Sequence, residues 1–325
     1  MRVLHVACLP FPSYQGTQAA VDSILATATS VGHDSQLITY ASGGYEIAPS
    51  YELHRIGDFP NVRSLRSGPS LGKLALDVRC VFEIRRQATL LEPDAIVAHH
   101  IEAALACIAA NAGQVHYLAH TSIETELPTY FPRLPAGPVA ATGRLLESKV
   151  CERVASVGAV SPDLATALSR DATYVPVPWR AIGTDGPGRR EARQTLDLPD
   201  DALVCLYAGN LDRYQGWENL IEALRLLRTT HRDAILLVAT ESRPDPALAY
   251  AARLGLGNAL HVVRLDGEPA RRCVHAAADL AWIPRRAPGG LPIKMLDAFA
   301  RHLPVVATER ATAGLPARDA CVAVR

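Results

Sequence analysis

The sequence has no excess of either charge, few aromatic residues and no long apolar run. Its 33 basic and 33 acidic side chains cancel, whereas a nucleic-acid-binding surface normally comes with a basic excess. Aromatic residues make up only 6%. No apolar run approaches the roughly 20 residues that a membrane-spanning helix needs. We therefore expect neither a nucleic-acid partner nor a membrane span.

Paired cysteines are also lacking. The seven cysteines are odd in number and contain no CxxC pair, so neither a disulfide framework nor a zinc site is indicated. The apolar run at Met1–Pro10 ends after the length of a strand, which is too short for a secretory signal. We expect reduced, buried thiols in a cytoplasmic protein. The cysteines are Cys8, Cys80, Cys107, Cys151, Cys205, Cys273 and Cys321.

What the sequence does have is a regular alternation of short apolar strands and helical patterns over 325 residues. Such alternation is typical of βαβ units with a parallel sheet. In the first half, the expected strands are Val3–Leu9, Gln36–Tyr40, Ala95–His99, Val115–Ala119 and Val157–Ser161. The expected helices there are Gln18–Val31, Leu71–Leu91, Glu102–Ala112 and Gly143–Val154.

A Gly- and Pro-rich stretch at Trp179–Asp201 interrupts this rhythm, which restarts at the strand Leu203–Ala208. We therefore predict two domains, residues 1–178 and 179–325, each a Rossmann-like doubly wound parallel sheet of the α/β class. Ligands of two such domains are expected in a cleft that both domains face. The sequence ends soon after the strand Pro304–Thr308, so we expect C-terminal closing elements to be missing.

Two loops of the second domain favour an anionic ligand. In the first, Gly209 ends a strand without a side chain, Asn210 follows it, and Gln215 and Gly216 precede a helix whose N-terminal amides favour an anion. An ordinary βα loop that uses glycine for its geometry explains the same residues equally well.

The second loop, Pro284–Asp297, carries more charge. Gly289 and Gly290 expose backbone amides just before a helix, and Lys294 lies in the first turn of that helix. A cation is disfavoured there unless an anion binds beside it. With Arg285 nearby, the loop favours a diphosphate site over a surface lysine.

Asp297 lies one helical turn beyond Lys294. Its carboxylate has two interpretations: it accepts hydrogen bonds from a ribose, or it forms an i,i+3 ion pair with Lys294.

The first domain offers fewer charged candidates. Gly16 follows the first strand and opens a helix, either for close approach of a ligand or as a plain turn with Thr17 as the N-cap. His120 ends the strand Val115–Ala119, where it can contact a sugar hydroxyl or move a proton. His99 and His100 end the neighbouring strand, but strand alternation separates their side chains, and no metal is expected.

The helix Leu71–Leu91 is amphipathic and carries Lys73, Arg79, Arg85 and Arg86. Peripheral contact with an anionic membrane is one interpretation. Since acidic residues dilute this charge, a solvated helix face is favoured.

Three parts of the sequence together resemble one enzyme family. Tyr207–Ala223 matches its pattern of a strand, a glycine loop and a helix. Asp297–Thr308 matches its closing element, an acidic helix followed by Pro-Val-Val-Ala-Thr. Gly16 and His120 match its early glycine loop and its cleft histidine. On these residues the chain resembles the GT-B glycosyltransferases of family 4, the retaining group 1 type.

The chain departs from this family at three positions. The arginine and lysine that usually hold the donor diphosphate are Asn210 and Gln215 here, and the first acid of the E-x7-E motif is Gly289. We expect Arg285 and Lys294 to supply the missing positive charge.

The resemblance implies a retaining, metal-independent transferase without a cofactor. Its donor would be a nucleotide-diphosphate sugar such as a UDP-sugar, and its acceptor an unidentified glycan, lipid-linked or small molecule. The alternatives are a nucleotide-sugar-binding partner subunit with little activity and a related GT-B epimerase. The implied donor contacts are Gly209, Asn210, Gln215, Gly216, Arg285, Gly289, Gly290, Leu291, Lys294 and Asp297. The implied acceptor side comprises Gly16, Thr17 and Glu124, with His120 as the catalytic residue.

Overall fold

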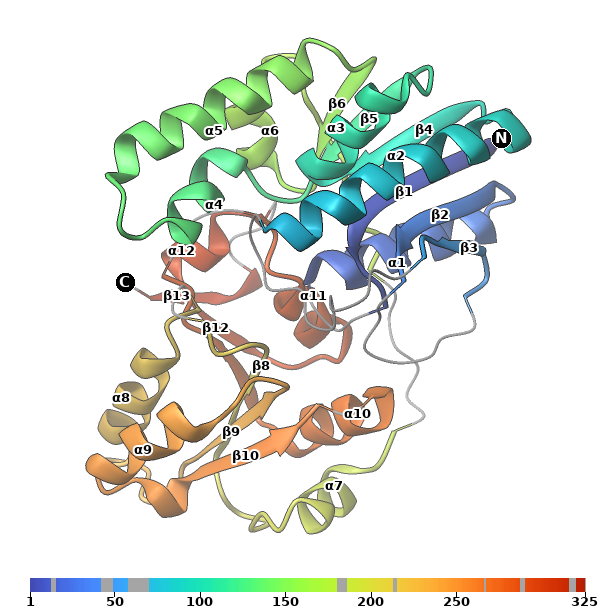
Figure 1. The fold of residues 1–325 in the computed structure, drawn as a ribbon. Coiled ribbons are helices and arrows are strands. Elements are labelled where there is room, and N and C mark those ends of the chain that lie inside the picture. The colour runs from blue at the N-terminus through green and yellow to red at the C-terminus, as the bar shows by residue number, and fades with distance from the viewer. Residues whose placement is uncertain are drawn as a thin grey trace. The chain divides into compact units, whose positions relative to one another are not determined.

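The computed structural model describes residues 1–12, 16–41, 49–57, 70–179, 186–212, 215–265, 267–286, 290–315 and 320–324. The chain divides into two compact units (Figure 1). Unit 1 comprises Met1–Pro178 with Gly289–Leu291, and unit 2 comprises Trp179–Pro288 with Pro292–Arg325.

Unit 1 contains a sheet of seven parallel strands in the order β3-β2-β1-β4-β5-β6-β7. The strands are β1 (Arg2–Pro10), β2 (Asp34–Tyr40), β3 (Glu52–Arg55), β4 (Ala95–His99), β5 (Val115–Ala119), β6 (Ser156–Ala159) and β7 (Thr173–Tyr174). The helices are α1 (Gly16–Ser30), α2 (Leu71–Leu91), α3 (His100–Ala110), α4 (Ile123–Tyr130), α5 (Ala136–Cys151) and α6 (Pro162–Leu168).

Helices cover both faces of this sheet because alternate strand residues point to opposite sides. Leu4 and Val6 of β1 pack into a core with α2 and α3. Ala7 packs with Val21 and Leu25 of α1 on the other face. A parallel sheet buried on both faces accounts for the nearly continuous apolar strands of the sequence.

Unit 2 contains six parallel strands in the order β10-β9-β8-β11-β12-β13. The strands are β8 (Val204–Ala208), β9 (Ile235–Thr240), β10 (Leu260–Arg264), β11 (Leu280–Ile283), β12 (Val305–Thr308) and β13 (Val322–Val324). The helices are α7 (Arg189–Thr195), α8 (Trp217–Leu227), α9 (Asp245–Arg253), α10 (Gly267–Ala277), α11 (Ile293–Ala300) and α12 (Glu309–Thr312), with a 3-10 turn at Gly257–Ala259.

A buried arginine attaches the first helix of unit 2 to its sheet. Arg193 of α7 is fully buried. Its guanidinium donates to the carbonyl oxygens of Asp200 and Ala202 and pairs with Asp279 at 2.8 Å. Asp279 also accepts from the backbone amide of Val204 at 2.8 Å. A buried charge needs such complete pairing.

The predicted fold class of two doubly wound parallel sheets is confirmed. Both sheets have their first strand beside their fourth, so each has a switch point, between β1 and β4 and between β8 and β11. The sequence did not predict the short edge strands β3, β7 and β13, nor helices α4, α6 and α12. In the part of the chain that the structure describes, no helix is long and apolar enough to cross a bilayer.

Candidate functional site

In unit 2, the candidate residues gather where β8 ends beside α11. Nζ of Lys294, in the first turn of α11, donates to Oε1 of Gln215 at 2.8 Å and to the hydroxyl of Tyr207 at 3.3 Å. It also lies 4.6 Å from the centroid of the Tyr207 ring, a cation–π distance. Two loops that are far apart in the sequence therefore meet at one ammonium group.

Gly209 makes room for this ammonium group. A Cβ at position 209 would lie 2.8 Å from Nζ of Lys294. The absence of a side chain thus serves the lysine directly, whereas the sequence indicated only close approach by a ligand or backbone. The Gly209 amide donates to the carbonyl of Ala239 at 2.9 Å, so the end of β8 remains in the sheet.

The environment of Lys294 disfavours its charged form. Burial is the main cause, and the nearby Arg285 adds repulsion, so the pKa of Lys294 is lowered to about 7. Within the described residues, no carboxylate lies within 4 Å of its Nζ. An ammonium group with neutral partners and reduced hydration is suited to an incoming anion.

The remaining residues of the first loop shape the start of α8. Gly216 is the N-cap of α8 with φ +70°, and a Cβ there would collide with the carbonyl oxygen of Pro284. Tyr207 donates to the carbonyl oxygen of Asn210 at 2.5 Å. Oδ1 of Asn210 is buried and has no hydrogen-bond partner among the described residues. Such an orphaned acceptor is unusual in a folded protein.

Side-chain donors bind the backbone carbonyl oxygens of the second loop. The carbonyl oxygens of Arg285 and Arg286 accept from Thr308 Oγ1 and Arg310, each at 2.7 Å. The side chain of Arg286 donates to Asn219 at 2.6 Å. Gly290 has φ +59°.

Leu291 is partly buried. The predicted donor residue Gly289 lies outside the described residues.

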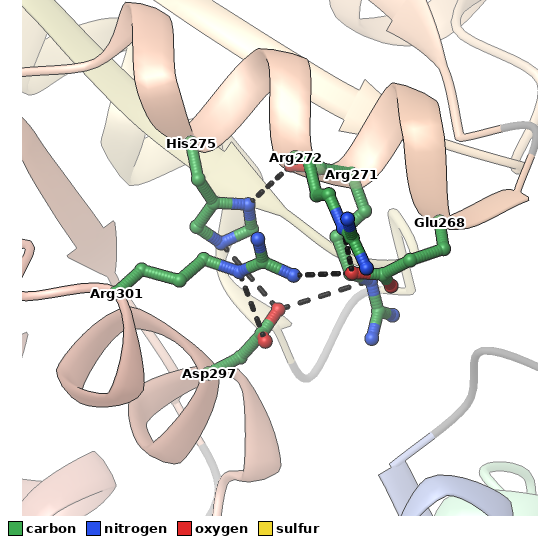
Figure 2. A network of polar contacts seen from close by, with 6 residues as sticks. All are labelled: Glu268, Arg271, Arg272, His275, Asp297 and Arg301. Carbon is green, nitrogen blue, oxygen red and sulfur yellow. Dashed lines mark hydrogen bonds and ion pairs between the residues drawn. The ribbon is translucent and has the colours of Figure 1, made fainter. Parts of the chain in front are cut away.

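Asp297 faces a buried ionic network between α10 and α11 (Figure 2). Its carboxylate lies 3.3 Å from Nε of Arg301, 3.5 Å from Nε2 of His275 and 3.8 Å from Nε of Arg271. Arg301 also pairs with Glu268 at 2.9 Å. Of the two expected partners of Asp297, the ion pair with Lys294 does not occur among the described side chains.

Burial lowers the pKa of His275, although the neighbouring Asp297 carboxylate opposes that shift. The network therefore contains a neutral imidazole between a carboxylate and two guanidinium groups. No local sequence pattern indicated these contacts, since they join side chains of two separate helices, α10 and α11.

In unit 1, His120 belongs to a cluster of four histidines. Its Nε2 lies 3.1 Å from Nδ1 of His99, and Nε2 of His99 lies 3.0 Å from Nδ1 of His5. The ring of His100 stacks on His120, with centroids 5.3 Å apart. His100 has φ +71° at the start of α3. The sheet register places His99 against His120, and the left-handed turn brings His100 against the same ring. Both side chains therefore contact His120, which the expected separation by strand alternation did not predict.

The acceptor-side residues occupy different places in unit 1. Gly16 is the exposed first residue of α1, and Thr17 follows it inside the helix, so Thr17 is not the N-cap. Its Oγ1 lies 3.2 Å from Nε2 of His100. Glu124, in the first turn of α4, accepts from Nε of Arg144 on α5 at 2.9 Å. Thr17 therefore joins the histidine cluster, whereas Glu124 connects two helices.

The buried carboxylate of Glu147 accepts hydrogen bonds from the start of α4. Its carboxylate accepts from Ser122 Oγ at 2.8 Å and from the Tyr117 hydroxyl at 3.1 Å. Burial raises the pKa of Glu147. Neutral donors hold this carboxyl, in contrast to the cations around Asp297. Among the described residues, no group of three or more His, Cys, Asp and Glu side chains is arranged to hold a metal ion.

The basic side chains of α2 are largely engaged within the protein. Lys73 pairs with Glu102 at 2.7 Å, and Arg86 pairs with Glu83 at 2.6 Å. Arg85 donates to the carbonyl of Ala109 at 2.8 Å. The choice between a solvated helix face and peripheral membrane contact stays a prediction.

Two family models match the chain. One, described as glycosyl transferases group 1, matches residues 202–322. The other, described as a glycosyl transferase 4-like domain, matches residues 15–185, more than half of the chain. No curated protein matches the sequence at a significant level.

Solved structures share the whole architecture at low identity. Sucrose-phosphate synthase of Thermosynechococcus elongatus is 16% identical with a TM-score of 0.74, covering 95% of this chain and 81% of that one. WaaG, a glycosyltransferase involved in lipopolysaccharide biosynthesis, is 18% identical with a TM-score of 0.67, covering 97% and 82%. HepE of Anabaena, solved with UDP and glucose, is 17% identical with a TM-score of 0.67, covering 95% and 81%. At these identities the likeness shows the fold.

Proposed function

The chain belongs to the group 1 glycosyl transferases with the GT-B fold, and from this we infer that it transfers a sugar from a nucleotide-diphosphate sugar to an acceptor. Unit 2 binds the donor, as its basic residues favour an anion. The presence of UDP and glucose in the structure of HepE supports a UDP-sugar as the first donor to test.

One observation carries this proposal: among the residues that the structure describes, the hydrogen-bond partners of the Lys294 ammonium group are neutral. Its Nζ lies at the end of β8, bonded to Gln215 at 2.8 Å. Gln215 occupies the position where the family usually has a lysine. The cation thus reaches the same loop from a different helix, and a diphosphate beside it would relieve its poor solvation.

The reaction we propose is retaining and metal-independent. Loss of the nucleoside diphosphate leaves oxocarbenium-like charge on the sugar and negative charge on the leaving group. Lys294, Arg285 and the amides at the start of α11 supply positive charge for that leaving group. Positioning of the acceptor hydroxyl supplies the rest of the rate enhancement.

Unit 1 supplies the acceptor side in this proposal. His120 and Thr17 offer neutral polar groups that suit sugar or alcohol hydroxyls. Gly16 and Glu124 lie at the starts of α1 and α4. The acceptor is a glycan, a lipid-linked sugar or a small molecule, and the lowered pKa of His120 favours an uncharged hydroxyl-bearing group.

A second candidate is a nucleotide-sugar-binding subunit with little activity. The uncharged Asn210 and Gln215 favour it, because two cations of the family pattern are absent there. Its binding chemistry is the same, so only turnover separates the two functions.

The test is a donor screen on the full chain. Calorimetry with UDP, GDP and their sugars identifies the base, and release of nucleoside diphosphate in the presence of acceptor extracts reports transfer. Binding with turnover supports the transferase, and binding without turnover supports the subunit. No binding of any nucleotide sugar would reject both. The anomeric configuration of the product then tests retention, and activity in excess chelator tests metal independence.

A further inference from the structure

Three histidines of unit 1 form one continuous hydrogen-bonded chain. His5 Nδ1 lies 3.0 Å from His99 Nε2, and His99 Nδ1 lies 3.1 Å from His120 Nε2. All three are buried, with residue exposures of 4%, 0% and 4%. A row of imidazoles inside a parallel sheet is not explained by packing, because each ring brings two polar nitrogens into the interior.

The sheet register creates this row. Ala7 of β1 pairs with His99 of β4, and His99 pairs with Leu118 of β5. Paired residues of parallel neighbours point to the same face, and so do residues two apart on one strand. His5, two before Ala7, and His120, two after Leu118, therefore lie on the face of His99. The line of rings runs from the interior of β1 to the carboxyl end of β5.

A neutral imidazole has one N–H donor and one acceptor nitrogen. His99 uses both nitrogens within the chain, so the hydrogen bonds run in a single direction. Either all three histidines carry the proton on Nδ1, or all three carry it on Nε2. The chain thus couples the tautomer of His120 to that of His5.

The environment of His5, at the inner end of the row of histidines, decides between the two directions of hydrogen bonding. Nε2 of His5 is buried and has no hydrogen-bond partner among the described residues. With protons on Nε2, this atom would be a buried N–H without an acceptor. With protons on Nδ1, it is only an unused lone pair, which folded proteins tolerate better than an orphaned donor. The Nδ1 direction is therefore favoured.

The surroundings keep the three hydrogen-bonded histidines neutral. Burial lowers the pKa of His5 to about 3 and lowers the pKa values of His99 and His120 well below the usual range. The only other groups that contribute to these shifts are histidines, including His100. Since no carboxylate among the described residues contributes to these shifts, a proton passed inward from His120 would create an uncompensated cation. The row of three histidines is thus unsuited to net proton transfer.

We propose that His99 and His5 are positioning residues that hold His120 as the neutral tautomer with its proton on Nδ1, so that His120 binds its ligand as a hydrogen-bond donor. The complementary ligand atom is an oxygen acceptor, a sugar hydroxyl or phosphate oxygen. Only the identity of this ligand rests on the proposed function. His120 then orients a substrate and does not act as a general base.

The direct test needs no substrate. Nitrogen-15 NMR of histidine rings in the full chain reports the protonated nitrogen, with signals assigned through single His→Gln variants. We expect His5, His99 and His120 to be neutral and protonated on Nδ1 throughout pH 6–8. A proton on Nε2 of His120, or an imidazolium there above pH 6, would overturn the proposal. Either result stands even if the protein transfers no sugar.

Variants of the middle histidine test the coupling. His99→Phe removes both hydrogen bonds and should turn His120 into a mixture of tautomers. His99→Gln keeps a donor and an acceptor and should restore one tautomer. His116→Gln on β5 is the matched control, since His116 bonds only to Ser156 in this region. An unchanged His120 spectrum in folded His99→Phe would contradict the coupling.

If a donor is found, the same variants have a kinetic signature. His99→Phe should lower kcat/KM by about 5- to 10-fold, the value of one hydrogen bond. His99→Gln should recover most of that loss, and the pH profile should keep its shape because no titrating base has been removed. A new slope between pH 6 and 8 in His99→Phe would instead indicate that His120 acts as a base.

Discussion

Units 1 and 2 build the same sheet topology but place opposite chemistry at its strand ends. Beside β4 and β5, unit 1 has four histidines in contact with one another, and His100 also contacts Thr17. Beside β8, unit 2 has Lys294, Arg285 and polar neutral partners. One strand order thus supports a neutral site and a cationic one.

The surroundings of the buried carboxylates also differ between the two units. Asp297 of unit 2 is buried among Arg271, Arg301 and His275. Glu147 of unit 1 is buried among hydroxyl and amide donors. A site for a diphosphate needs fixed positive charge, whereas a site for hydroxyl groups needs directed donors and acceptors. The division of charge between the units therefore matches a division between donor and acceptor.

The largest effect is expected when the Lys294 cation is removed from unit 2. Lys294→Ala should weaken UDP or GDP binding by about 100-fold or more, as truncation of one partner in a charged hydrogen-bonded pair does. Calorimetric titration of the purified chain measures the change. Lys149→Ala is the control, because Lys149 pairs at the surface with Glu152. Unchanged affinity in Lys294→Ala would remove the basis for a diphosphate site at this lysine.

The buried carboxyls provide the next test. Asp297→Asn removes the buried carboxylate that faces Arg271, His275 and Arg301, and should lower the stability of unit 2 by roughly 2–3 kcal/mol. Glu147→Gln keeps an acceptor for Ser122 and Tyr117 and should cost under about 1 kcal/mol. Denaturant titration of both variants measures the contrast. If Asp297→Asn leaves stability intact but weakens UDP binding, the ribose contact predicted from the sequence is the better interpretation.

A smaller effect is expected from the loop that carries Gln215. Gly216→Ala introduces a Cβ at φ +70° against the carbonyl of Pro284, and should cost roughly 2 kcal/mol while weakening UDP binding. Gly255 has nearly the same φ, +71°, with open space around its Cβ position. Gly255→Ala should therefore cost only about 1 kcal/mol from backbone strain and leave UDP binding unchanged. Equal losses would show that the collision with Pro284 is not decisive.

The sequence predicted the fold because strand and helix periodicities are local properties. It also singled out Lys294, since a cation in a first helical turn contradicts the helix dipole. Helix starts were less accurate: α5 begins at Ala136, not at the predicted Gly143. Pro138 lies in the first turn of this helix, where proline is tolerated.

The contacts of the site residues were mostly beyond the reach of the sequence. His5 lies within an apolar strand, and only the sheet register brings it to His99. Arg271 and Asp297 are joined by the packing of two helices, which no local pattern encodes. The assigned roles of the site residues remain predictions, whereas the positions of those that the structure describes are now defined.

The last prediction is a pH dependence that should arise from one unit alone. Burial lowers the pKa of Lys294 to about 7, and a bound diphosphate, by attraction, raises it. The bound form therefore holds more proton than the free form above pH 7. UDP affinity should be highest below pH 7 and then fall, by at most about tenfold per pH unit, until the raised pKa of the complex is reached.

Phosphate groups lose their last proton near pH 6, so a titration from pH 7 to 9 isolates the lysine. In Lys294→Arg the cation persists over this range, and the slope should disappear. Calorimetry in buffers of different ionisation enthalpy should also detect proton uptake by the unaltered chain. His5, His99 and His120 stay neutral throughout, because burial lowers their pKa values below this window. An equal slope in Lys294→Arg would therefore show that another group titrates. It would contradict the contrast between the neutral histidines of unit 1 and the Lys294 cation of unit 2.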